Sequence, residues 1–116
     1  MAHHFASRLR THRQKSGLSQ RELAYILGYT STGQVIQHEY ARNAPPFLMA
    51  LAYEAVFRIP VSQLFPGFYE TVVHGIEIRL TELEQTLQSK SVKGRGMRRT
   101  AHKLEWLFAR RNGIEI

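Results

Sequence analysis

Two glutamines in the first half of the chain, Gln34 and Gln37, have side chains that could read a DNA base. A glutamine amide can pair with both N6 and N7 of adenine, which neither lysine nor glutamate can do. Arg42 and Asn43 follow a few residues later, and donors that flank a helix commonly reach phosphate. Glutamine is also an ordinary exposed helix residue. Whether these side chains bind DNA therefore depends on the elements that position them.

The segment around these glutamines has the pattern of two short helices joined by a tight turn. Ser19 and Glu22 have the spacing of a capping box, in which each side chain accepts a backbone N–H at a helix start. Apolar residues follow at helical spacing, and Gly28 suits a left-handed helix end. Residues 31–34 (STGQ) repeat the capping pattern and predict a helix from about Thr32 to Arg42. This order predicts a helix-turn-helix, whose second helix can enter the major groove.

The composition favours a polyanionic partner. The 116 residues include 16 Lys and Arg against 9 Glu and no Asp, a formal net charge of +7. There is no cysteine, which excludes disulfides and thiolate metal sites. No apolar run reaches the ~18–20 residues that span a bilayer, and residues 1–4 do not begin a secretory signal. We expect a cytoplasmic protein with no membrane partner.

No set of residues indicates catalysis. The sequence has no converging nucleophile and base, no paired carboxylates and no glycine loop for phosphate, so we predict no enzymatic activity and no cofactor. His12 and His38 could bind a metal together with His3 or His4. Without cysteine, aspartate or a local ligand spacing, we interpret them as core histidines and predict no metal site.

The remaining apolar pattern predicts an all-α protein. We expect a first helix over 5–16, a second over 19–27, a fourth over 47–57 and a short fifth over 61–65 that Pro66 and Gly67 close. The fourth is apolar over more than one face, which predicts a helix buried at the centre of the bundle. Residues 1–67 form the expected first domain.

The second predicted domain, residues 68–116, contains two helices of opposite charge. An acidic helix, a polar loop over 89–96 and a basic helix from Met97 to about Gly113 predict an antiparallel hairpin with complementary faces. The acidic helix carries a heptad stripe, which could pack on its own bundle or form a dimer seam. Trp106 and Phe108 add aromatic surface, so we favour the seam. The stripe consists of Tyr69, Val73, Ile76, Leu80, Leu83 and Leu87.

Taken together, residues 5–67 resemble the Xre family, the Cro- and phage-repressor-like helix-turn-helix regulators. The resemblance implies a five-helix repressor-like bundle whose third helix enters the major groove, usually in a symmetric dimer. The motifs that carry it are Arg8-Leu9-Arg10, Arg13, Gly17-Leu18-Ser19-Gln20, Glu22-Leu23-Ala24, Gly28, Glu39, Pro45, Leu51-Ala52 and Val61 to Phe65.

The resemblance also implies roles for single residues. Arg13 matches an arginine of helix 1 that pairs with a glutamate of helix 3, here Glu39. The base-reading positions fall on Thr32, Gly33 and Gln37, with Gln34 beside them. To phosphate contacts we assign Gln20, Ser31, Tyr40, Arg42 and Asn43.

Several positions depart from the family pattern. The turn over 29–32 is one residue longer than the common form, and Ala41 replaces a helix-ending glycine. His12 and His38 stand at positions that are usually apolar. These departures affect the register of single base contacts.

The sequence thus predicts a DNA-binding transcriptional regulator that binds a pseudo-palindrome of double-stranded DNA as a homodimer. The alternative is an antitoxin-like interaction module that binds a protein partner through its C-terminal helices.

Overall fold

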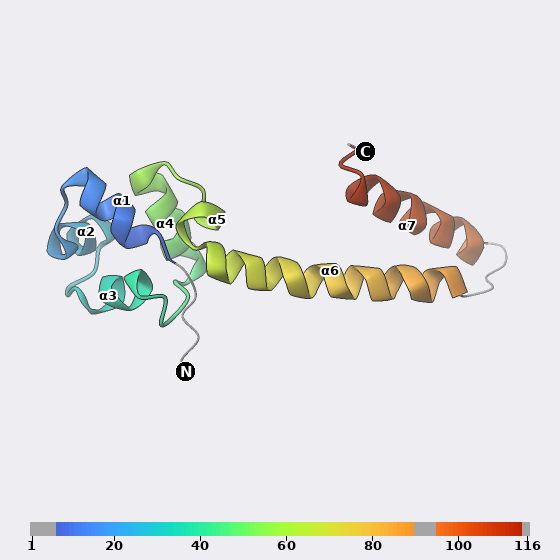
Figure 1. Cartoon of the computed structure of the whole chain (residues 1–116), viewed down its shortest axis with the longest axis horizontal. Helices are drawn as coiled ribbons and strands as arrows, with labels where there is room; N and C mark the ends of the chain where they lie inside the picture. The colour runs from blue at the N-terminus through green and yellow to red at the C-terminus, as the bar shows by residue number, and fades with distance from the viewer. Residues whose placement is uncertain (1–6, 90–94, 115–116) are drawn as a thin grey trace. The chain divides into compact units, whose positions relative to one another are not determined.

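The protein is all-α, as the sequence predicts. The computed structural model describes residues 7–89 and 95–114, and these form seven helices and no strand (Figure 1). The helices are α1 (Leu9–Ser16), α2 (Gln20–Leu27), α3 (Gly33–Glu39), α4 (Phe47–Phe57), α5 (Val61–Leu64), α6 (Pro66–Ser89) and α7 (Arg95–Arg111). None of them is both long and apolar enough to cross a membrane.

The chain divides into two compact units, with the boundary between Val72 and Val73, inside α6. The first unit contains α1 to α5 and the start of α6. Its core consists of seven buried side chains: Leu9, Leu23, Ala24, Val35, Tyr53, Leu64 and Phe65. The rings of Tyr53 and Phe65 lie 5.9 Å apart at the centre of this core.

Two glycines end the first two helices in the left-handed conformation. Gly17 has a φ of 79° after α1 and Gly28 has a φ of 84° after α2. A residue with a Cβ would be strained at either place. These two ends set the short connections that bring α1, α2 and α3 against one core.

Several predicted helix boundaries were wrong. Ser7 and Arg8 precede α1, which begins at Leu9, and the earlier part of the predicted helix, residues 5–6, lies outside the described residues. The third helix is shorter than predicted and ends at Glu39. Pro66 starts α6 directly instead of closing the fifth helix together with Gly67, since proline is favoured in the first turn of a helix.

The prediction that α4 is buried at the centre of the bundle was also wrong. Tyr53 is its one fully buried residue, whereas Phe47, Leu48 and Leu51 are exposed. The α4 side chain of Glu54 contributes a polar link instead. Its carboxylate accepts the backbone N–H of Val61 at 2.9 Å and joins α4 to the start of α5.

In the second unit, α7 runs antiparallel to the end of α6, with charge complementarity between them. Arg110 donates to Glu77 at 2.7 Å, and Arg111 pairs with Glu84. The last residues of α7 thus pair with Glu77 and Glu84 of α6. Leu87 and Leu107 are buried here. The predicted loop over 89–96 is shorter than expected, because Ser89 belongs to α6 and Gly96 to α7.

Candidate nucleic-acid interface

The start of α2 carries the predicted capping box. The hydroxyl of Ser19 accepts the N–H of Glu22 at 3.0 Å, and the Glu22 carboxylate accepts the N–H of Ser19 at 2.9 Å. The backbone N–H of Ser19 lowers the pKa of Glu22 by stabilising its charged form. The box fixes the first turn of α2 and with it the position of Gln20.

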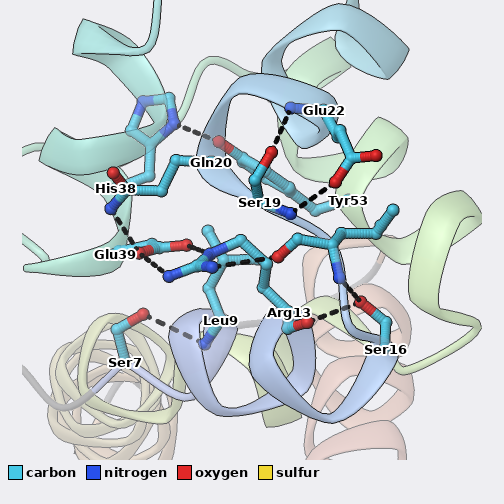
Figure 2. Close-up of polar contacts among 11 residues, drawn as sticks. Ser7, Leu9, Arg13, Ser16, Ser19, Gln20, Glu22, His38, Glu39 and Tyr53 are labelled. Carbon is cyan, nitrogen blue, oxygen red and sulfur yellow. Dashed lines mark hydrogen bonds and ion pairs between the residues drawn. The ribbon is translucent and has the colours of Figure 1, made fainter.

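Buried Glu39 and half-buried Arg13 and Gln20 form a polar cluster between α1, α2 and α3 (Figure 2). Arg13 donates to both carboxylate oxygens of Glu39, through Nε at 2.5 Å and Nη2 at 3.2 Å. Gln20 donates its amide to the same carboxylate at 3.1 Å, and Arg13 also reaches the carbonyl of Leu18. The Glu39 side chain has no exposed surface, and that of Arg13 is 12 % exposed. One carboxylate therefore ties α3 to both preceding helices.

A second buried contact lies beneath α3. Nδ1 of His38 and the hydroxyl of Tyr53 are joined by a 2.7 Å hydrogen bond, with the two rings edge to face (Figure 2). Burial lowers the pKa of His38 and raises that of Tyr53, so both groups favour their neutral forms. The prediction that His38 is a core residue is thus confirmed. His12 is only half-buried, with its ring 6.5 Å from that of Phe57, so the same prediction was wrong for it.

The residues assigned to base contacts surround the start and outer side of α3. Gly33 and Gln34 are exposed, and Thr32 and Gln37 are half-buried. The inner side of the same helix contributes Val35, His38 and Glu39, all buried. The predicted second capping box was wrong. Thr32 is the N-cap but has helical backbone angles and makes no side-chain cap bond.

The residues assigned to phosphate contacts lie at the start of α2, in the turn before α3 and directly after α3. Ser31, Tyr40, Arg42 and Asn43 are exposed, and Gln20 is half-buried because its amide reaches Glu39. The Arg42 guanidinium lies 5.1 Å from the centre of the Tyr40 ring, within the range of a cation–π contact.

Between Tyr40 and Arg42, Ala41 takes the left-handed conformation with a φ of 53°. Ala41 therefore adopts the left-handed conformation that glycine commonly takes after a helix, and this residue turns the chain after α3.

The sequence analysis missed two hydrogen-bond donors on α2 that lie near Ser31. Arg21 and Tyr25, one turn apart on α2, line a hollow of about 390 Å³ together with Thr30, Ser31 and Thr32 of the turn. Both α2 side chains are exposed. Their spacing of four residues on the outer face of a predicted helix was the available signal.

The partner of His38 was missed too. A histidine at an apolar position needs a hydrogen-bonding partner, but Tyr53 stands 15 residues away and no local spacing connects the two. No three metal-ligating side chains come together among the described residues.

The six residues of the predicted dimer seam differ in how exposed they are in the single chain. Leu87 is buried and Leu80 half-buried, while the other four members of the stripe are exposed. These are Tyr69, Val73, Ile76 and Leu83.

Comparisons with known protein families, with curated proteins and with solved structures found no significant match.

Proposed function

We propose that this protein is a sequence-specific DNA-binding transcriptional regulator of the Xre type, which reads the major groove with α3. The observation that carries the proposal is the division of α3 into two sides. Its inner residues Val35, His38 and Glu39 are buried, while Gly33 and Gln34 are exposed at its first turn. A seven-residue helix held in this way can present side chains to base edges without contributing them to the core.

The surrounding charges support the same proposal. Arg42 and Asn43 follow α3 directly, Arg21 lines the hollow before it, and the whole chain has a net charge of +7. Such an arrangement suits phosphates on both sides of a groove.

We propose further that the regulator acts as a homodimer. Four of the six stripe residues of α6 are exposed in the single chain, and a second copy would cover them. A two-fold dimer would recognise half-sites about one helical turn, ~34 Å, apart or a multiple of it.

The decisive experiment is selection of bound sequences from random duplex DNA. We expect a palindromic consensus. Gln34→Ala and Gln37→Ala should then lower affinity for that site by about 1–3 kcal/mol and leave binding to random duplex nearly unchanged. The matched control is Gln14→Ala, an exposed glutamine on α1, which should change neither affinity. If both variants keep the full preference of the wild type, α3 does not read DNA in this register.

A second candidate function is an antitoxin-like module that binds a protein through its C-terminal helices. It is favoured by the exposed side chains of Met97, Trp106 and Phe108 on α7. In that case residues 68–116 should be sensitive to protease in the purified protein and become protected by the partner. Resistance of this segment in the protein alone would argue against it.

A further inference from the structure

The basic helix α7 has one side that faces α6. At 3.6 residues per turn, Leu104, Leu107 and Arg111 share a side. Leu107 is buried, Leu104 is half-buried and Arg111 pairs with Glu84 of α6. This side forms the apolar part of the contact within the second unit, and Arg110 adds an ion pair with Glu77 of α6. The exposed side chains on the two flanks of α7 remain accessible to other partners.

One flank combines cations with an aromatic ring. Arg99, Lys103 and Trp106 follow at spacings of four and three and therefore lie on one side of the helix. All three are exposed, the indole to 46 %. Neither Arg99 nor Lys103 forms an ion pair with any described residue, whereas Arg110 beside them is paired with Glu77. Two cations and a flat apolar ring are thus free to meet the same ligand.

The other flank is apolar and carries Met97, Ala101 and Phe108, all exposed. In helices that lie on membranes, tryptophan belongs to the apolar side and the cations oppose it. Here Trp106 lies on the side of the cations instead. This placement favours a partner that offers negative charge and a flat apolar surface together.

We propose that the flank formed by Arg99, Lys103 and Trp106 binds single-stranded nucleic acid. The two cations neutralise phosphates, and the indole stacks on an unpaired base. In a duplex the base faces are stacked on one another, and a side chain reaches them only at the cost of unstacking a base step. This surface belongs to the second unit and to a different ligand from the duplex proposed for α3, so either proposal can fail without the other.

Trp106 is the sole tryptophan of the chain, so intrinsic fluorescence reports directly on this flank. The full-length protein is titrated with oligo(dT) of about ten nucleotides, within the site sizes of single-strand binders. We expect saturable quenching of the indole. An oligo(U) of the same length should quench as well, because stacking does not read the sugar. An abasic oligomer of equal length carries the phosphates without bases and should bind without quenching.

Variants separate charge from stacking, with binding followed by the anisotropy of a labelled oligomer. Trp106→Leu should weaken oligo(dT) binding on the order of tenfold and leave the abasic oligomer unaffected. Arg99→Ala combined with Lys103→Ala should weaken both ligands. Arg79→Ala removes an exposed cation from α6 and should weaken neither. Circular dichroism verifies that each variant keeps its helices.

Three results would overturn the proposal. The first is unquenched fluorescence in the presence of saturating oligo(dT) and oligo(U). The second is equal affinity of wild type and Trp106→Leu for oligo(dT), which would leave only charge attraction. The third is tighter binding to anionic phosphatidylserine vesicles than to oligo(dT), with a blue shift of the indole, which would assign the flank to a membrane surface.

Discussion

Replacing Arg13 with alanine should destabilise the first unit more than any exposed substitution. The change removes two of the three donors to the Glu39 carboxylate, at Nε and Nη2, and leaves only the amide of Gln20. Because the Glu39 side chain has no exposed surface, a charge would remain buried without its counterion. Removal of one partner of a buried pair costs about 3–5 kcal/mol.

That cost is large compared with the whole stability of a small domain, which is about 5–15 kcal/mol. At ~4–8 °C per kcal/mol for a domain of this size, the midpoint of thermal unfolding should fall by about 12–40 °C. Urea unfolding followed by far-UV circular dichroism measures the free energy directly. Lys15→Ala, an exposed cation on the same helix, serves as the control and should change stability by less than about 0.5 kcal/mol.

A double variant separates loss of the pair from loss of packing. If the buried charge causes the damage, adding Glu39→Gln to Arg13→Ala should recover most of the lost stability, since it removes that charge. Should Arg13→Ala alone cost less than about 1 kcal/mol, the pair would behave as a solvated surface pair, and the role assigned to it would be refuted.

Three further predictions concern assembly, electrostatics and pH. Ile76→Glu, at an exposed position of the stripe, should yield monomers in sedimentation equilibrium and weaken binding to the preferred DNA site. Ile78→Glu, exposed but outside the stripe, should do neither. A wild-type protein that is monomeric at tens of micromolar would exclude the dimer. Arg42→Ala should weaken binding to the preferred DNA site and to random duplex alike. The slope of log K against log[salt] should become shallower by about 0.9 for each phosphate that the variant no longer neutralises. An unchanged slope would show that Arg42 does not bind phosphate. Burial lowers the pKa of His38 in the folded state. In the unfolded state the same side chain is protonated below its ordinary pKa of about 6.5, so acidification favours unfolding. The His38 contribution to stability is complete above that pH and is lost as the pH falls below it, by at most about 1.4 kcal/mol per pH unit. Urea unfolding at about pH 7.5 and 5.5 should therefore show a smaller loss on acidification in His38→Gln than in wild type, and equal losses would contradict the assignment.

Local signals account for the parts of the fold that the sequence predicted well. Ser19 and Glu22 cap α2, and Gly17 and Gly28 end two helices with positive φ, as their residue types indicate. Each of these features depends on a few neighbouring residues. The all-α class follows from the same kind of information, because helical periodicity repeats within every segment.

Contacts between distant residues could not be predicted from local spacing, and the Arg13–Glu39 pair was expected only because of the family resemblance. The apolar residues of α4 cover more than one side, so periodicity could not show that Tyr53 points inward and Leu48 outward. Pro66 is compatible both with the end of one helix and with the start of the next, and only the packing of Phe65 in the core decides between them. The buried bond between His38 and Tyr53 joins two elements whose spacing follows no repeat.

The seven residues of α3 divide into buried residues that position the helix and exposed residues that are free for the proposed contact with DNA. A helix this short does not form alone in water, so its position must come from tertiary contacts. Val35 supplies apolar burial, while His38 and Glu39 supply hydrogen bonds that fix the rotation and height of the helix. Gly33 and Gln34 are exposed and contribute little to that positioning. If α3 reads DNA as proposed, substitutions there should change the preferred bases at almost no cost in stability, whereas substitutions at the three inner positions should lower both stability and DNA binding.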